Sequence, residues 1–264
     1  LREYVEKAKI DKQEALHMIT RNVVGFDIDG LAVLTARTNY LIALGDLLAY
    51  KGNELIEIPV YLADSIAIRR RAAFTEKGEV APRIIITTSV GEFSIPESLI
   101  RSGKLLLVLN ELRQFVALTL EPSRVKEHLK KLGLTEDELL AVINLYRQLL
   151  DLERKGLNHV WTSILKSAVM PVVFSKLSIV EEKSASLFDY VFGNPPWLIY
   201  RYVANERYQR ELKDLIKYQY CIVTDERLIN VMELATLFLI RCIDLYLRDG
   251  GLLGFVMPLS LIHI

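Results

Sequence analysis

The chain has 264 residues, which suits one large domain, or one domain with an insertion, better than two independent cores, since domains average about 150 residues. Hydrophobic residues make up 51% and charged residues 25%, and the 33 Lys and Arg balance the 33 Asp and Glu. These values exclude a disordered chain and a polybasic tail, so any role in nucleic-acid binding must be argued from a site.

Membrane and metal-binding classes are not indicated either. The most apolar stretches, 105–120 and 234–247, are each interrupted by charges and fall short of the ~20 apolar residues that a membrane span requires. Cys221 and Cys242 form no C-x-x-C motif, and the four histidines do not stand at ligand spacing. The sequence predicts no transmembrane helix and no metal site.

The first 65 residues are predicted to form a helix followed by a strand–helix–strand unit. Residues 1–20 have the apolar spacing of an amphipathic helix. A strand over 22–29 precedes a helix over 31–48, and Asp29 is placed to cap that helix. A second strand follows over 56–65, which completes the order expected of a parallel βαβ unit.

A second pair of strands is predicted near the end of the chain. One strand covers 188–193, and another covers 251–258 after a helix over 233–248, whose end is marked by Gly250 and Gly251. Apolar strands that alternate with helices favour an α/β fold with a parallel sheet covered on both faces.

The interval from Asp64 to Asn194 is too long for an ordinary crossover and predicts an inserted, mainly helical subdomain. Residues 135–138 form a capping box that opens a helix running out before Gly156. Residues 82–96 are rich in β-formers and are expected to be a strand pair or an edge strand.

Acidic residues end the first two predicted strands. Asp27 follows one and Asp64 the other. In an open α/β sheet, ligands bind beyond the carboxyl ends of the strands, where an acid can accept hydrogen bonds from both hydroxyls of a ribose. The two acids together suggest a nucleoside site; the alternative is that Asp29 is only a helix cap and Asp64-Ser65 only a turn.

A more specific pattern, Asn194-Pro195-Pro196-Trp197, follows the third strand. An exocyclic aromatic amine is a poor nucleophile because its lone pair is delocalised into the ring, and acceptors aimed at both N–H bonds localise that pair. The Asn194 side chain and the Pro195 carbonyl are such acceptors, and Trp197 offers a surface for a flipped-out base. The alternative is a tight turn beside a core tryptophan.

The run 188–197 closely resembles motif IV of the S-adenosylmethionine-dependent adenine-N6 DNA methyltransferases, especially the large type IIG and type I-like restriction-modification proteins. The resemblance covers 21–66 and 160–258, although Gly30 stands where that family usually has proline. Other segments resemble the family's motifs in the family's order: motif II at 25–33, motif III at 63–65, motif V at 233–239 and motif VI at 250–258.

This resemblance implies roles for particular residues. Asp27 would hold the ribose hydroxyls of S-adenosylmethionine, Ile28 would pack on its adenine, and Asp64, with Ser65 beside it, would accept from the adenine amine. Asn194 would contribute to both the cofactor site and the catalytic site. The implied catalytic residues are Asn194, Pro195, Pro196 and Trp197, and no metal is implied.

The implied fold is a Rossmann-like methyltransferase sheet, partial because its first strand, with the glycine-rich motif I, is missing from the chain. The chain would divide into a partial cofactor-binding half at 1–66, a mainly helical insertion at 67–159 between the third and fourth family strands, and a catalytic half at 160–264. Residues 259–264 do not resemble the family's continuation.

The implied function is site-specific methylation of the adenine N6 amine in DNA, within a restriction-modification or related defence system of the prokaryotic cytoplasm. The implied partners are double-stranded DNA with a flipped adenine and a specificity or endonuclease region elsewhere in the parent chain, without a membrane. The alternatives are methylation of protein glutamine or RNA, and a non-catalytic DNA-binding fragment. A nicotinamide dehydrogenase is disfavoured because the chain has no G-x-G-x-x-G.

Two further clusters have open interpretations. Residues 69–71 are three consecutive arginines, which either contact DNA phosphates or form a solvated charge run. Tyr200, Arg201 and Tyr202 either line the base pocket or the DNA path, or serve ordinary core and surface roles.

Overall fold

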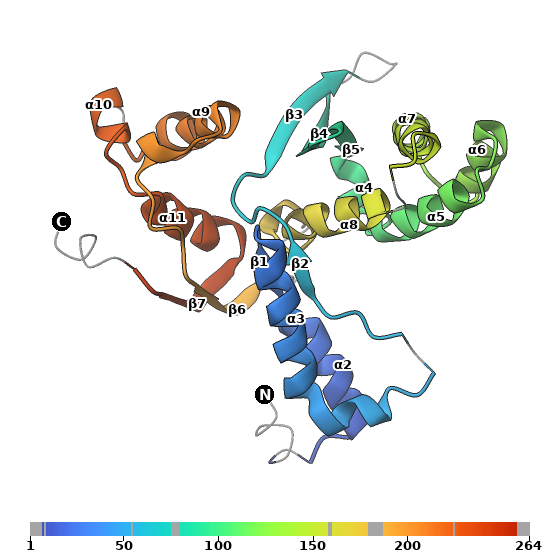
Figure 1. Cartoon of the computed structure of the whole chain (residues 1–264), viewed down its shortest axis with the longest axis horizontal. Coiled ribbons are helices and arrows are strands. Elements are labelled where there is room, and N and C mark those ends of the chain that lie inside the picture. The colour runs from blue at the N-terminus through green and yellow to red at the C-terminus, as the bar shows by residue number, and fades with distance from the viewer. Residues whose placement is uncertain are drawn as a thin grey trace. The chain divides into compact units, whose positions relative to one another are not determined.

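The computed structural model describes residues 7, 9–53, 55–74, 80–157, 160–178, 187–223 and 225–257 (Figure 1). The chain forms two compact units. Unit 1 consists of residues 1–65 and 69–171, and unit 2 consists of residues 66–68 and 172–264. The predictions made for residues 1–6, for Pro258 and for 259–264 lie outside the described residues.

Unit 1 begins with helix α2, Lys12–Asn22, which buries Ala15, Leu16 and Ile19. The Asp11 carboxylate accepts hydrogen bonds from the first-turn amides of this helix at 2.9 and 3.2 Å. Within the described residues the helix predicted over 1–20 is not continuous, because Asp11 is the N-cap of a helix that begins at Lys12; this helix ends two residues beyond the predicted end.

The βαβ unit is present. Strand β1, Gly25–Asp27, pairs in parallel with β2, Val60–Leu62, and helix α3, Gly30–Leu44, connects them. A 3-10 segment η1, Gly45–Tyr50, extends the helix. The predicted cap is confirmed: Asp29 Oδ1 accepts from the amides of Leu31 and Ala32 at 2.7 and 3.0 Å. Both strands are shorter than the apolar runs that predicted them.

Among the described residues, one helix is long and apolar enough to cross a membrane by length and composition alone. It is the continuous helical stretch Gly30–Tyr50. The Arg37 side chain in its middle donates to the Val60 carbonyl of β2 at 2.8 Å, so this stretch is tied to the sheet of the βαβ unit.

A three-stranded antiparallel sheet follows, made of β3, Arg69–Phe74, β4, Val80–Thr88, and β5, Gly91–Pro96, in that order. The strand pair expected over 82–96 is confirmed as β4 and β5, whereas β3 was not predicted. Four helices complete this part of unit 1: α4, Glu97–Arg101; α5, Leu105–Ala117; α6, Pro122–Lys130; and α7, Glu136–Arg154.

The predicted capping box is confirmed at the start of α7. Thr135 Oγ1 accepts from the Glu138 amide, and a Glu138 carboxylate oxygen accepts from the Thr135 amide at 2.9 Å. Ser98 on α4 donates to the other oxygen of Glu138 at 2.6 Å, so the same side chain also ties α7 to α4.

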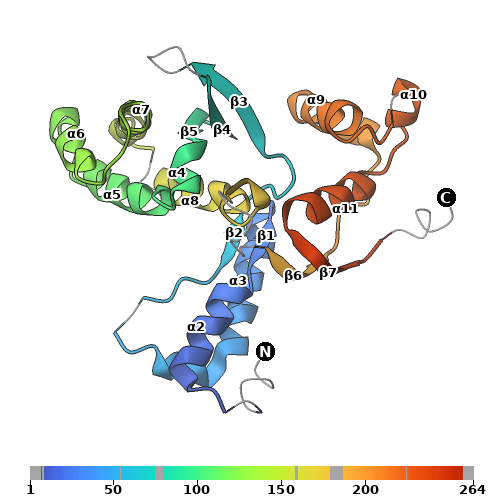
Figure 2. The same ribbon diagram turned by 180° about the vertical axis from the view of Figure 1, so that it is seen from behind.

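Unit 2 contains the second parallel pair, β6, Phe188–Gly193, and β7, Leu247–Phe255. Helix α11, Leu234–Leu245, connects to β7 and packs against it (Figure 1 and Figure 2). The remaining elements that lie in or enter unit 2 are α8, Val160–Val173; η2, Lys176–Ser178; η3, Tyr200–Tyr202; α9, Glu206–Asp214; the π-helix η4, Leu215–Gln219; and α10, Glu226–Ile229.

The prediction that Gly250 and Gly251 end the helix before β7 is wrong. The helix ends at Leu245, and both glycines lie inside β7, where the register with β6 shifts and the strand carries extra residues as a bulge. Gly250 has a φ of +74°, which side chains disfavour. Glycine marks helix ends and bulges alike, so the local sequence could not separate the two.

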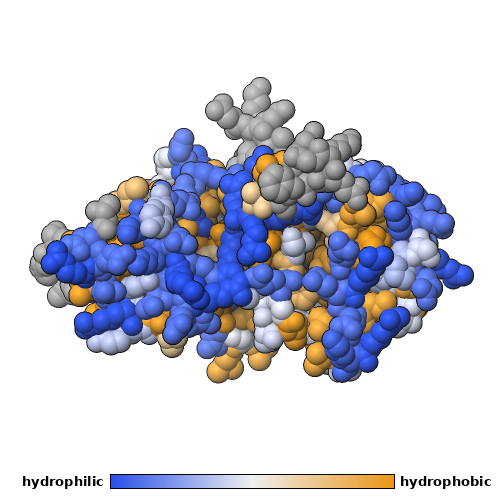
Figure 3. Space-filling model, turned by 90° about the horizontal axis from the view of Figure 1, so that it is seen from above, coloured by the Kyte–Doolittle hydropathy of each residue, from blue (hydrophilic) through white to orange (hydrophobic). Residues whose placement is uncertain are grey.

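The expectation of one sheet buried on both faces also differs from the structure. The strands of the two parallel pairs form separate two-stranded sheets among the described residues. One face of β6 and β7 is open, because Tyr190, Phe192 and Leu252 are exposed, and the first two rings stack with an interplanar angle of 2°. Hydrophobic side chains reach the surface elsewhere too, as patches between hydrophilic ones (Figure 3).

Candidate functional site

The acidic residues of the first half lie together at the carboxyl edge of β1 and β2. Asp27 ends β1 opposite Leu62 of β2, and the Ala63 amide donates to the Asp27 carbonyl at 2.9 Å. Asp64 follows directly after Ala63. The parallel pairing therefore brings both predicted acids to the same edge of this small sheet.

Asp27 is exposed, and its Oδ1 accepts from the Asp29 amide at 2.8 Å. Asp27 Oδ2 has no hydrogen bond within the described residues. Ile28, beside it, is 75% exposed. This edge thus presents a carboxylate oxygen and an apolar side chain next to each other, while Asp29 serves as the cap. Asp64 and Ser65 are half-buried.

The Asn194–Trp197 loop begins where β6 ends. Asn194, Pro196 and Trp197 are exposed, and Pro195 is buried. The Trp197 ring is 59% exposed, which excludes the alternative of a core tryptophan. The Asn194 side chain makes no hydrogen bond within the described residues, so its amide oxygen is available to a ligand.

The loop is held from the side by the end of β7. The Val256 amide donates to the Gly193 carbonyl at 3.1 Å, and Trp197 Nε1 donates to the Val256 carbonyl at 3.3 Å. The glycine before the loop is required by packing, since a Cβ at Gly193 would lie 2.9 Å from the Phe255 ring. Both bonds use the Val256 main chain, so the sequence, in which Val256 is part of the 250–258 segment, did not indicate its contact with the loop.

The exit of the loop is held by the start of α11. The Leu234 amide donates to the Leu198 carbonyl, and the Tyr200 amide donates to the Met232 carbonyl, both at 2.9 Å. Ile199 also forms an antiparallel bridge with Glu233. The four-residue loop is therefore anchored at both ends by backbone hydrogen bonds, and its exposed side chains project from a fixed main chain.

The residues after the loop have different roles. Tyr200 is buried in the core of unit 2, its hydroxyl donates to the Gln209 carbonyl at 3.0 Å, and burial raises its pKa. This makes Tyr200 a core residue. Arg201 and Tyr202 are exposed, and the guanidinium lies 4.8 Å from the centre of the Tyr202 ring. Their contact with DNA stays a prediction.

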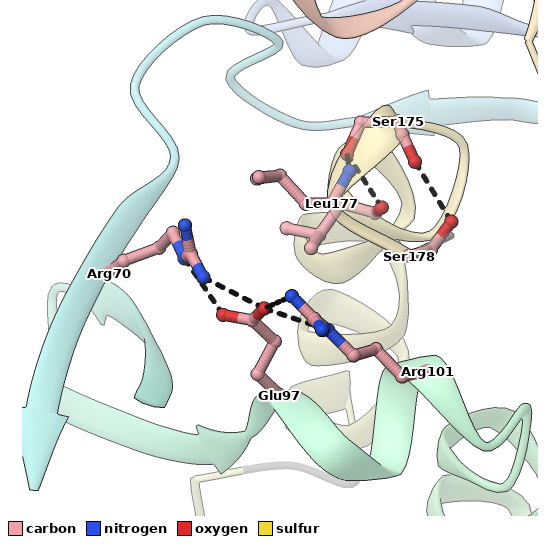
Figure 4. A network of polar contacts seen from close by, with 7 residues as sticks. Arg70, Glu97, Arg101, Ser175, Leu177 and Ser178 are labelled. Atoms are coloured by element: carbon pink, nitrogen blue, oxygen red, sulfur yellow. Dashed lines mark hydrogen bonds and ion pairs between the residues drawn. The ribbon is translucent and has the colours of Figure 1, made fainter. Parts of the chain in front are cut away.

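The three arginines 69–71 are ion-paired side chains on β3. Arg70 donates through Nε and Nη2 to the two oxygens of the fully buried Glu97, at 2.8 and 2.9 Å, and Arg101 donates to the same carboxylate (Figure 4). Arg69 and Arg71 pair with Glu92 at 3.4 and 3.7 Å. Arg70 and Arg71 are exposed as well as paired, as a solvated charge run would be, and contact with DNA phosphates stays a prediction.

The predicted site residues thus fall into two groups. Asp27, Ile28, Asp64 and Ser65 belong to unit 1, and the Asn194–Trp197 loop belongs to unit 2. Within the described ranges, no group of three or more His, Cys, Asp or Glu could hold a metal ion. The available chemistry is that of carboxylate and amide acceptors, an exposed indole and apolar surface.

Comparison with known proteins identifies the class of this chain. The Eco57I restriction-modification methylase family matches residues 21–263, a range that includes both groups of site residues and the interval between them. No significant match is found among curated proteins or among solved structures. A match over nearly the whole length shows a methyltransferase of restriction-modification type, whose substrate class is DNA. The chain belongs to the Eco57I restriction-modification methylase family.

Proposed function

We propose that the chain transfers a methyl group from S-adenosylmethionine to the N6 amine of adenine in double-stranded DNA. The observation that carries this proposal is the Asn194–Trp197 loop, whose main chain is anchored at both ends while Asn194 and Trp197 stay exposed. A loop of this kind can hold a planar base with an exocyclic amine without moving when the base arrives.

Asn194 and Pro195 would activate the amine. The Asn194 side-chain oxygen and the Pro195 carbonyl accept the two N6 hydrogens, which localises the lone pair on the nitrogen and makes it nucleophilic. Trp197 stacks on the flipped adenine, an interaction worth ~1–3 kcal/mol per base. S-adenosylmethionine supplies, when bound, an electrophilic methyl group on a sulfonium, so the protein's contribution is mainly positioning and polarisation.

The acidic edge of unit 1 fits a nucleoside cofactor. Asp27 Oδ2 is free to accept from ribose hydroxyls, because only Oδ1 is used by the Asp29 amide. The exposed Ile28 side chain offers apolar surface to an adenine ring. Asp64, with Ser65, would accept from the adenine amine, and Asn194 would contribute to the cofactor site from the catalytic loop.

Each parallel pair fits a part of a Rossmann-like sheet. Within the described residues, β1 pairs with β2 only and β6 with β7 only, so each pair has an open edge at β1 or β6. We propose that residues 1–66 are the cofactor-binding half of such a sheet, 67–159 the insertion and 160–264 the catalytic half.

The acceptor and the setting follow from the family. Methylation of protein glutamine or RNA would use the same loop chemistry, but membership of a restriction-modification family favours DNA. The parent protein would act in the prokaryotic cytoplasm with a specificity or endonuclease region, and no membrane would take part. A non-catalytic DNA-binding fragment remains the contrasting outcome of the experiment.

The first experiment measures S-adenosylmethionine binding by calorimetry on two forms: this chain, and the longest natural form of the protein that contains it. Asp27→Ala should abolish or strongly weaken binding, whereas Asp46→Ala, an exposed acid in the same unit, should not. Folded proteins that bind no donor in either form would overturn the cofactor assignment.

The second experiment identifies the methylated atom. The donor-binding form is incubated with DNA and labelled S-adenosylmethionine, and the DNA is digested to nucleosides. N6-methyladenine is expected from the wild type and from Asn230→Ala, an exposed asparagine outside the loop, but not from Asn194→Ala. Label in cytosine, in RNA or in protein only would contradict the proposed acceptor.

A further inference from the structure

Arg241 is a buried cation in the middle of α11, with its side chain only 3% exposed. Its Nε and Nη2 both donate to the Ile66 carbonyl, at 2.9 and 2.7 Å. Its Nη1 donates to the Tyr220 hydroxyl at 2.8 Å, and that hydroxyl donates in turn to Asp244. Two donors of this buried guanidinium are therefore directed at one main-chain oxygen.

The residue that Arg241 holds belongs to a three-residue segment, Ile66–Ile68, which is part of unit 2 although its chain neighbours on both sides belong to unit 1. The Ile66 side chain is 2% exposed and lies in the same core cluster as Leu234 and Leu237 of α11 and Tyr200. The segment is thus fixed twice, by its side chain in the core and by its carbonyl on the guanidinium.

One face of α11 links this segment to the catalytic loop. Leu234, Leu237 and Arg241 are spaced by three and four residues, which places them on the same side of the helix. The Leu234 amide binds the Leu198 carbonyl at the loop exit, and Arg241 lies about two turns, roughly 10 Å, further along the helix. A single rigid element therefore holds both the loop and Ile66.

Ile66 follows Asp64 by two residues, so the main chain next to the proposed cofactor acid is anchored on the helix that anchors the catalytic loop. We infer that Arg241 is a positioning residue for Asp64, which it acts on through the Ile66 carbonyl. This inference rests on the proposed function, because it takes Asp64 to bind S-adenosylmethionine and explains how that residue is held in place.

Tyr220 prepares Arg241 for this role. It follows the π-helix η4, a rare helix form that often occurs at functional sites. Its hydroxyl accepts from Nη1 of Arg241 and donates to Asp244, and its pKa is raised by burial and by that carboxylate. The Tyr220 hydroxyl thus links Nη1 of Arg241 to the Asp244 carboxylate, while Nε and Nη2 remain bonded to the Ile66 carbonyl.

The anchoring is tested by hydrogen exchange on the full chain. Arg241→Met should speed exchange of the amides at 66–68 roughly tenfold, the loss expected for a hydrogen bond to a charged group. The amides of β6 and β7 should be unchanged, as should all amides in Arg227→Met, an exposed arginine of unit 2. If Arg241→Met does not fold, Tyr220→Phe should shift the same amides in the same direction by a smaller factor.

The positioning is tested by a double-mutant cycle on the affinity for S-adenosylmethionine, measured in the form that binds it. Asp64→Ala is expected to weaken binding by roughly 10- to 100-fold and Arg241→Met by roughly 5- to 10-fold. In the Asp64→Ala background, Arg241→Met should change affinity by less than about twofold, since the group it places is gone. Arg241→Lys, which keeps the charge but not the fork of donors, should lie between wild type and Arg241→Met.

The outcomes separate the two proposals. Coupled losses of affinity together with faster exchange at 66–68 support the inference. Unchanged exchange at 66–68 overturns the anchoring. Faster exchange with unchanged or additive losses of affinity overturns the positioning and leaves the proposed function intact. No binding by the wild type, in either form, overturns the proposed function and with it the positioning of Asp64, while exchange still reports the anchoring.

Discussion

The two groups of site residues are held in different ways. The Asn194–Trp197 loop follows a six-residue strand, and backbone hydrogen bonds from Val256 and Leu234 fix it on either side. The acidic edge follows two strands of three residues each. The Asn194–Trp197 loop is thus fixed within its unit by several elements, whereas the acidic edge depends on the helix cap and on the chain that follows it. Substitutions of exposed loop side chains should therefore lower activity without lowering stability, whereas substitutions at the acidic edge should affect both.

The largest expected effect is a loss of activity at the loop. Asn194→Ala removes one of the two acceptors for the target amine and should lower the rate of methyl transfer by roughly 10²–10³-fold, as loss of one positioned polar group does elsewhere. The melting temperature should not change, since this exposed side chain makes no hydrogen bond within the described residues. A large loss of stability would show that Asn194 is structural.

A pair of glycine substitutions tests whether the loop is the more tightly packed region. Gly193→Ala places a Cβ 2.9 Å from the Phe255 ring and should cost about 1–3 kcal/mol of unfolding free energy. Gly25→Ala, in β1, meets Val60 at an ordinary 3.5 Å and should cost less than about 1 kcal/mol. Chemical denaturation measures both, and equal costs would remove the contrast.

Trp197 should matter to the base and little to the fold. Trp197→Ala is expected to weaken binding of DNA containing a flipped or unpaired adenine by ~1–3 kcal/mol, the value of one stacked base. Fluorescence anisotropy with matched duplexes measures this. The free energy of unfolding should fall by less than the free energy of DNA binding, because the indole is largely exposed. A larger loss of stability than of binding would indicate that Trp197 has a packing role.

At the acidic edge, substitutions of the two neighbouring acids Asp27 and Asp29 should have different effects. Asp29→Ala removes the cap of α3 and should destabilise unit 1 by about 1 kcal/mol. Asp27→Ala should change stability less and donor binding more. Thermal melting and calorimetry on both variants decide between the cap and the ligand roles, and a reversed pattern would exchange the two assignments.

The last prediction concerns unit 2, where the expected effect is negligible near neutral pH and grows only at alkaline pH. Burial raises the pKa of Cys242 to about 12 from an ordinary value of 9.0. The folded thiol therefore stays neutral while the unfolded one ionises, so stability should be fully present below pH 9 and decline as the pH rises from there toward 12. Cys242→Ala should remove this part of the pH dependence. Exposed Cys221 should react with a thiol reagent in the native state, and Cys242 only after unfolding.

Local signals in the sequence were sufficient where the structure is local. The bounds of β6, the cap at Asp29 and the capping box at Thr135 all agree with the structure, because each depends on residues within a few positions of one another. The exposed position of Asn194 and Trp197 after β6 also agrees with the prediction from this short motif, while their chemical roles stay predictions.

Non-local partners explain the failures. Strand β3 begins with three arginines and has no apolar alternation, yet it forms because Glu92 and Glu97 on other elements neutralise them. The bulge at Gly250 depends on the register with β6, and the bond from Arg241 to Ile66 joins residues 175 positions apart. No window of the sequence contains both members of such pairs.

The small segment Ile66–Ile68 has a practical consequence for dividing the protein. Unit 2 cannot be cut out as one continuous stretch, because residues 172–264 alone would lack the Ile66 side chain of their core and would leave the Arg241 guanidinium without its carbonyl acceptor. Such a fragment should be unstable by itself and should be rescued when the complementary piece, residues 1–171, is supplied as a separate chain. The three residues make the protein a natural candidate for split-protein complementation.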